Sequence, residues 1–165
     1  MTHKQVMLCT PVRTAIGTYG GSLKDLLATE LGATVIRATI ERSGVDPSLV
    51  QTVVMGQVIQ AGARMNPSRQ AAIGAGIPVG VPAMTVNRVC GSGAQAIASA
   101  AQEVMLGHLD CAVAGGMENM SNAPYLIPEA RTGARLGHAQ LVDSMVHDGL
   151  WDIYNDFHMG MTGEK

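Results

Sequence analysis

Residues 83–106 read AMTVNRVCGSGAQAIASAAQEVML and contain an apolar strand, a short turn and an alanine-rich helix in direct succession. The β-branched and apolar residues up to Val89 predict the strand, and the alanine-rich run after Gly91 predicts the helix. Gly107 follows the last helical residue, where glycine commonly ends a helix. This strand-turn-helix unit predicts an α/β fold with Cys90 at the turn.

Similar patterns occur on both sides of this unit. Apolar, β-branched stretches predict strands, and helically spaced apolar residues or a cap followed by proline predict helices. We expect strands over residues 4–10, 52–59 and 110–116, and helices over residues 29–43 and from Asn66 onward. Strands without polar alternation, separated by helices, are typical of a mostly parallel sheet covered on both faces. The predicted fold class is therefore α/β.

The composition of the sequence changes after Met117. Residues 118–165 are rich in proline, arginine and small polar residues, which predicts a loop or cap region over a site. Within this region we expect a short helix over residues 141–147. We therefore divide the chain into an α/β domain, residues 1–117, and part of a loop region, residues 118–165. The final residues resemble the opening of another helix, which we interpret as a truncation.

Length, composition and charge exclude several function classes. A chain of 165 residues predicts one domain, and 47% hydrophobic residues suffice for a core. The 11 basic and 13 acidic residues give a net charge of −2, and only 3% are aromatic, which argues against nucleic-acid binding. The N-terminal apolar stretch is too short for a membrane span or a signal peptide, so we expect a cytoplasmic protein without a membrane partner.

The cysteines and histidines do not predict a metal site. Cys9, Cys90 and Cys111 form no C-x-x-C pair, and an odd number fits neither a disulfide framework nor a zinc site. We therefore expect reduced thiols and no metal. Four histidines lack metal-ligand spacing, and we interpret them as surface residues: His3, His108, His138 and His147.

Cys90 lies where the predicted strand meets a helix that opens with Gly91, Ser92 and Gly93. There its sulfur would face free main-chain N–H groups and the positive end of the helix dipole, which favour a thiolate. The small glycines leave room for a substrate carbonyl, and nearby N–H groups can stabilise an oxyanion. Cys90 is therefore a candidate nucleophile. The alternative is a structural cysteine, because free cysteines are among the most buried residues.

Two other interpretations of the turn are weaker. A phosphate-binding loop would end in Gly-Lys-Ser/Thr or extend to G-x-G-x-x-G, and neither pattern is present here. A hydrolase-type turn would require glycine two residues before the nucleophile, where this chain has Arg88. The sequence therefore favours neither a nucleotide site nor a hydrolase.

The turn and several other blocks resemble one known family. NRVCGSG, residues 87–93, is similar to the nucleophile segment of the thiolases, closest to the acetyl-CoA C-acetyltransferases. Further thiolase-like blocks follow in the family's order: TPVRTAIG at 10–17, GQV at 56–58 with NPSRQ at 66–70, AGGME at 114–118, and HMG at 158–160 followed by Thr162 and Glu164. The resemblance covers essentially the whole chain and implies the N-terminal half of the thiolase fold, with a mostly parallel, mixed sheet.

The resemblance implies a Claisen condensation of two acetyl-CoA molecules to acetoacetyl-CoA and CoA, or the reverse thiolysis. Cys90 would carry the acyl group, and its own N–H would form part of an oxyanion hole. No cofactor is implied beyond the CoA thioester substrates. His158 and Met159 match residues at the acyl and pantetheine end of the pocket, and Leu150 matches a residue beside the adenine. Taken alone, His158 fits a core histidine and Met159 a gap-filling core residue equally well.

By the same resemblance, the complete protein would be a homodimer or homotetramer. Residues 66–70, which otherwise indicate a capped helix start, would support the subunit contact near the nucleophile. Residues 117–121 look more like the short-chain enzymes than like long-chain 3-ketoacyl-CoA thiolases.

The sequence also departs from the family. Its C-terminal Gly-His-Pro and Cys-Gly-Gly-Gly motifs, which carry the activating histidine and the second catalytic cysteine, do not occur here, and neither Cys9 nor Cys111 matches them. We expect the C-terminal domain to be absent and this chain alone to be inactive or nearly so. Other interpretations are a non-catalytic or split-gene acyl-CoA binding or assembly module, and a condensing enzyme of fatty-acid or polyketide synthesis.

Overall fold

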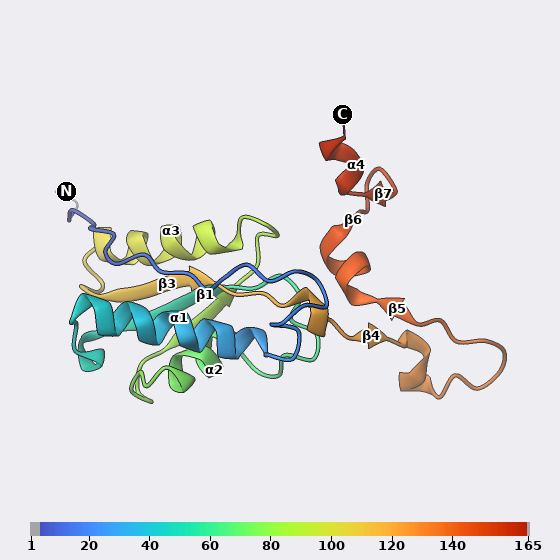
Figure 1. The fold of residues 1–165 in the computed structure, drawn as a ribbon, viewed down its shortest axis with the longest axis horizontal. Coiled ribbons are helices and arrows are strands. Elements are labelled where there is room, and N and C mark those ends of the chain that lie inside the picture. The colour runs from blue at the N-terminus through green and yellow to red at the C-terminus, as the bar shows by residue number, and fades with distance from the viewer. Residues whose placement is uncertain (1–3, 165) are drawn as a thin grey trace.

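The computed structural model describes residues 4–164 (Figure 1). Three parallel strands form one sheet in the order β2-β1-β3, with β1 at Thr52–Gly56, β2 at Ala83–Val86 and β3 at Ala112–Gly116. In the central strand, Val53 is paired with Ala83 on one side and with Val113 on the other. The predicted parallel sheet is confirmed.

Helices cover both faces of this sheet, as predicted. The helices α1, Ala28–Ser43, and α2, Pro67–Gly74, lie on one face, and α3, Ser92–Met105, lies on the other (Figure 1). A short 3₁₀ turn at Pro47–Leu49 leads from α1 into β1. The layers therefore form the α/β architecture that the strand-turn-helix units indicated.

The central strand β1 contributes side chains to two hydrophobic clusters, one on each face of the sheet, because successive side chains of a strand point to opposite faces. Val53 is fully buried in the larger cluster together with Ile36 of α1. Its neighbour Val54 is buried in a smaller cluster with Ala96 and Ala100 of α3. β1 thus packs against helices on both faces, which fixes α3 over the sheet.

The predicted helix boundaries are confirmed in their physical details. Asn66 Oδ1 accepts a hydrogen bond from the main-chain N of Arg69 at 3.3 Å, and Pro67 is the first residue of α2. α1 ends at Gly44, which has a φ of 69°, and Gly107 has a φ of 79° just after α3. Both glycines occupy the left-handed conformation that ends helices.

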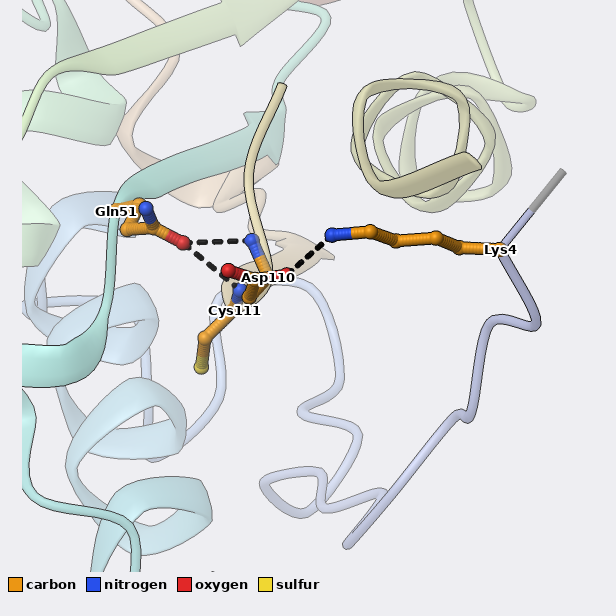
Figure 2. A network of polar contacts seen from close by, with 4 residues as sticks. All are labelled: Lys4, Gln51, Asp110 and Cys111. Carbon is orange, nitrogen blue, oxygen red and sulfur yellow. Dashed lines mark hydrogen bonds and ion pairs between the residues drawn. The ribbon is translucent and has the colours of Figure 1, made fainter. Parts of the chain in front are cut away.

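The strand expected over residues 4–10 is not formed. Met7 and Leu8 are 78% and 75% exposed, and the segment belongs to none of the described sheets. Its start is held by an ion pair between Lys4 Nζ and Asp110 Oδ1 at 2.5 Å (Figure 2). An apolar sequence becomes a strand when a neighbour takes its main-chain hydrogen bonds and packs on one face, and within residues 4–164 this segment has neither.

β1 ends at Gly56, three residues before the predicted end, because a side chain replaces the ladder there. The N–H groups of Val58 and Ile59 donate to the carboxylate of Glu118, at 2.8 and 3.2 Å. These bonds turn the chain away from its neighbouring strands.

β3 begins late for a similar reason at the opposite end of the sheet. The side-chain oxygen of Gln51 accepts hydrogen bonds from the N–H groups of Asp110 and Cys111, at 2.6 and 3.1 Å (Figure 2). The main-chain N–H of Gln51 still donates to the carbonyl of Cys111 at 2.9 Å, and the paired register with β1 begins at Ala112.

Beyond Met117 the chain leaves the sheet and forms an extension (Figure 1). It contains 3₁₀ turns at Met120–Asn122 and Pro128–Thr132, β4 at Tyr125–Leu126 paired with β5 at Val142–Asp143, a π-helix at Met145–Leu150, β6 at Trp151–Asp152 paired with β7 at Phe157–His158, and α4 at Gly160–Gly163. Both pairs are antiparallel and separate from the main sheet, so the main sheet is not mixed.

The structure of the extension corrects one expected helix and confirms another. The helix predicted over residues 141–147 has the wrong bounds, because Val142 and Asp143 pair with β4 and the helix begins only at Met145. The helix opening expected at the end of the chain appears as α4, while Lys165 lies outside the described residues. The domain boundary at residue 117 stays a prediction. None of the described helices is long and apolar enough to span a membrane.

Candidate active site

Cys90 lies in the turn between β2 and α3, and its side chain is exposed. Its interpretation as a buried structural cysteine is therefore wrong. The residue before it, Val89, has a φ of 48°, in the left-handed region that β-branched residues rarely adopt. Strained residues of this kind persist only where surrounding contacts hold them, and they gather at functional sites.

Ser92, the first residue of α3, holds this turn. Its buried hydroxyl accepts a hydrogen bond from the N–H of Arg88 at 2.8 Å and donates to the carbonyl of Val89 at 2.6 Å. The N–H groups of Gly91 and Ser92 donate to the carbonyls of Arg88 and Val89, both at 3.0 Å. The expectation of free N–H groups at the helix start is therefore wrong for these two residues, because the turn itself uses them.

Glycines bring the start of α3 against the ends of two strands. A Cβ on Gly56, the last residue of β1, would lie 2.5 Å from the carbonyl carbon of Ser92. A Cβ on Gly116, the last residue of β3, would lie 3.3 Å from the Cα of Gly93. Because backbone lies against backbone here, the Cys90 turn is placed at the carboxyl edge of the sheet, where parallel α/β proteins bind their ligands.

A chain of hydrogen bonds joins the carboxyl ends of all three strands to this turn. Asn87, directly after β2, accepts from the N–H of Val89 at 2.9 Å and donates through Nδ2 to the carbonyl of Val58 at 3.2 Å. Val58, two residues after β1, donates its own N–H to Glu118, which lies two residues after β3. The chain from Glu118 through Val58 and Asn87 therefore ends one residue before Cys90.

The carboxyl group of Glu118 is partly buried within this arrangement. Burial raises its pKa, and hydrogen bonds from the N–H groups of Val58, Ile59 and Asn119 offset only part of that effect. Buried Gln57 stabilises the loop that follows β1, because its Nε2 donates a hydrogen bond to the carbonyl of Ile59 at 2.9 Å. Its Oε1 is the only buried side-chain nitrogen or oxygen of residues 4–164 without a partner. Sequence reasoning gave Asn87, Glu118 and Gln57 no role.

The three predicted substrate-binding residues lie together in one hairpin of the extension. The N–H of Met159 donates to the carbonyl of Leu150 at 2.8 Å. His158 lies in β7, and its Nδ1 accepts a hydrogen bond from the N–H of Gly160 at 3.0 Å. The side chains of His158 and Met159 are both exposed, so their alternative interpretations as core residues are wrong.

The carboxylate of Asp152 shapes the turn of this hairpin. It accepts hydrogen bonds from Nδ2 of Asn155 at 2.8 Å and from the N–H groups of Asn155 and Tyr154 at 3.1 and 2.9 Å. These bonds, first among them the one from the Asn155 side chain, lower the pKa of Asp152.

The hydrogen bonds of Asp152, His158 and Met159 stay within the hairpin and its immediate neighbours and do not reach the Cys90 turn. The extension instead approaches the sheet at Ile59, where a Cβ on Gly149 would lie 3.2 Å from the Ile59 Cδ1. The structure thus brings together Leu150, His158 and Met159, and leaves Cys90 on a separate element.

Within residues 4–164, the remaining cysteines and histidines form no second site. Burial and, to a lesser degree, nearby Cys9 raise the pKa of Cys111. His108 and His147 are exposed and contact neighbouring carboxylates, His138 is exposed, and His3 lies outside the described residues. Over residues 4–164 there is no group of three or more His, Cys, Asp or Glu side chains that could hold a metal ion.

A parallel sheet covered on both faces, with an exposed thiol in a strand-to-helix turn at its carboxyl edge, defines an α/β protein with a candidate cysteine nucleophile. Residues 6–165 match the model of the thiolase N-terminal domain, and the chain belongs to that family. The predicted family and fold are confirmed.

Curated relatives are similar over nearly the whole chain. It is 56% identical over 162 residues to an acetyl-CoA acetyltransferase of Pseudomonas aeruginosa, 55% over 160 residues to one of Cupriavidus necator, and 51% over 162 residues to a probable acetyl-CoA acetyltransferase of Escherichia coli. These matches cover 98%, 97% and 98% of this chain but 41% of each relative. The chain therefore spans less than half the length of these relatives.

Proposed function

We propose that Cys90 accepts an acetyl group from acetyl-CoA, as the first half of an acetyl-CoA acetyltransferase reaction. The observation that carries the proposal is the exposed Cys90 thiol in a held, strained turn at the carboxyl edge of the sheet. The names of the relatives support acetyl-CoA as the acyl donor. In this step the Cys90 sulfur bonds to the carbonyl carbon, the bond from that carbon to the CoA sulfur breaks, and the thiol proton passes to the departing CoA.

The second half of the reaction belongs to the whole protein. There the enolate of a second acetyl-CoA attacks the acetyl group on Cys90, which gives acetoacetyl-CoA and frees the thiol; thiolysis is the reverse. Proton transfer from a carbon next to a carbonyl requires a positioned base. Because the sequence lacks the Gly-His-Pro and Cys-Gly-Gly-Gly motifs, which carry the activating histidine and the second cysteine, we expect the 165-residue chain to be acetylated slowly and to form no acetoacetyl-CoA, so that it is nearly inactive in the whole reaction.

We propose the hairpin of Leu150, His158 and Met159 as the CoA-binding element. The hydrogen bond between Met159 and Leu150 places the three residues at one end of the hairpin, with His158 and Met159 exposed. The whole protein is proposed to be a homodimer or homotetramer that acts on short acyl chains. Three free thiols support a reducing, cytoplasmic location.

The test is incubation of the 165-residue chain with acetyl-CoA, followed by intact mass measurement and peptide mapping. We expect one acetyl group, on Cys90, and none in the Cys90→Ala variant. Cys9 provides an internal control because it is also an exposed thiol. Equal labelling of Cys9 and Cys90 would show nonspecific acetylation and would overturn the proposal.

A further inference from the structure

The loop after β1 is held by the carboxylate of Glu118, which is not part of the Cys90 turn. Glu118 Oε2 accepts hydrogen bonds from two successive N–H groups, those of Val58 and Ile59, at 2.8 and 3.2 Å. A single acceptor that holds two adjacent donors fixes the orientation of the peptide between them. The carbonyl of Val58, the acceptor for Asn87, is part of that peptide.

Asn87 transmits this orientation to the Cys90 turn. Its Nδ2 is held by the Val58 carbonyl at 3.2 Å, so its Oδ1 is directed to the N–H of Val89 at 2.9 Å. Val89 is the residue whose φ of 48° requires support, and Cys90 follows it directly. Without a held Asn87 side chain, the strained turn loses one of its fixed acceptors.

We propose that Glu118 is a positioning residue for Cys90 and that it acts through Val58 and Asn87. This inference deepens the proposed function, on which its catalytic meaning rests. We assign Glu118 no contact with the substrate. It fixes the conformation of the turn that carries the nucleophile, and a nucleophile must be held in place to react efficiently.

The chain contains a matched control at the other end of the same sheet. Gln51 Oε1 also accepts two successive N–H groups, those of Asp110 and Cys111, at 2.6 and 3.1 Å (Figure 2). It fastens β3 to the start of β1, at the end opposite to the Cys90 turn. Replacing Gln51 by alanine therefore removes one side-chain acceptor of two N–H groups, but leaves the hydrogen bonds of Glu118, Val58 and Asn87 in place.

The experiment measures amide hydrogen exchange by NMR in the wild-type 165-residue chain and its variants. In Glu118→Ala we expect exchange at Val89, Gly91 and Ser92 to accelerate about fivefold or more, the factor that corresponds to one net hydrogen bond. Exchange within β1 should not change. Glu118→Gln keeps a side-chain oxygen and should restore the wild-type rates, whereas Gln51→Ala should accelerate exchange only at Asp110 and Cys111.

Variants of Asn87 test the path itself. Asn87→Asp keeps an acceptor for Val89 but loses the donor to Val58, so we expect it to behave like Glu118→Ala. Combining Asn87→Asp with Glu118→Ala should add little, because both break the same chain of bonds. The proposal is overturned when Glu118→Ala leaves the Cys90 turn unchanged, or when Gln51→Ala affects that turn equally.

The initial rate of Cys90 acetylation by acetyl-CoA is the second readout. We expect it to fall in Glu118→Ala and to recover in Glu118→Gln. When the wild-type chain is not acetylated at all, the proposed function fails, and the exchange rates still decide whether Glu118 positions the turn.

Discussion

The last residue of β1, Gly56, lies so close to Ser92 that a Cβ on Gly56 would stand 2.5 Å from the Ser92 carbonyl carbon. Ser92 begins α3 and holds the turn that carries Cys90. The approach is between two main-chain segments, so no side-chain rotation can relieve an added methyl group. The position of the candidate nucleophile therefore depends on a glycine 34 residues earlier in the chain.

Gly56→Ala should destabilise the chain by about 2 kcal/mol or more, because the added methyl group forces the sheet and α3 apart. Thermal or urea unfolding measures this loss. Gly80→Ala is the control, since a Cβ there would meet nothing within 4 Å. Equal stability of the two variants would contradict the close approach.

Val89→Asn should stabilise the chain by about 1 kcal/mol, because asparagine tolerates the left-handed conformation better than a β-branched residue. Little apolar burial is lost, since Val89 is 51% exposed. Val79→Asn is the matched control: Val79 is also exposed, but its φ is negative. Urea unfolding of both variants tests the strain, and a stability gain in neither would show that Val89 is not strained.

Glu118→Gln should be at least as stable as the wild type at pH 7. The raised pKa of Glu118 means that its charged form is disfavoured in the fold, so the stability it contributes when protonated is lost as pH rises through its folded-state pKa. The variant carries no charge and keeps an oxygen for the two N–H groups. Melting temperatures of both proteins should therefore converge at acid pH, and a gap that widens on acidification would contradict this prediction.

The N–H resonances of Tyr154 and Asn155 should titrate with a midpoint below the ordinary aspartate value of 3.8, because their acceptor Asp152 has a lowered pKa. Stability from these bonds is present above the unfolded-state pKa and is lost as pH falls through the folded-state pKa. NMR spectra across acid pH measure the midpoint. In Asp152→Asn the same resonances should show no such titration.

The body of the fold could be predicted from the sequence because its signals are local. Asn66 and Pro67 indicate the start of α2, and Gly44 indicates the end of α1. The segment at residues 4–10 could not be judged in this way, since its apolar sequence suits a strand but no described strand pairs with it. A strand forms only when a neighbouring strand accepts and donates its main-chain hydrogen bonds, and the local sequence does not show whether a distant segment will do so.

Of the candidate site, the nucleophile could be predicted from the sequence, but the residue that we propose positions it could not. Cys90 could be found because a cysteine between a strand and a glycine-rich helix start is a local pattern. Glu118 could not, because its contacts with Val58 and Ile59 span about 60 residues of sequence. Its sequence signals were its place in the thiolase-like block at residues 114–118 and its position shortly after a buried strand that ends in two glycines, and neither signal indicates its partners.

The most direct test of reversible acyl transfer to Cys90 is exchange of isotopically labelled CoA into unlabelled acetyl-CoA by the 165-residue chain. We expect the wild-type chain to catalyse this exchange, the Cys90→Ala variant to lack it, and neither protein to form acetoacetyl-CoA. Exchange at the same rate in Cys90→Ala, or no exchange by a folded wild-type chain, would contradict acyl transfer to Cys90.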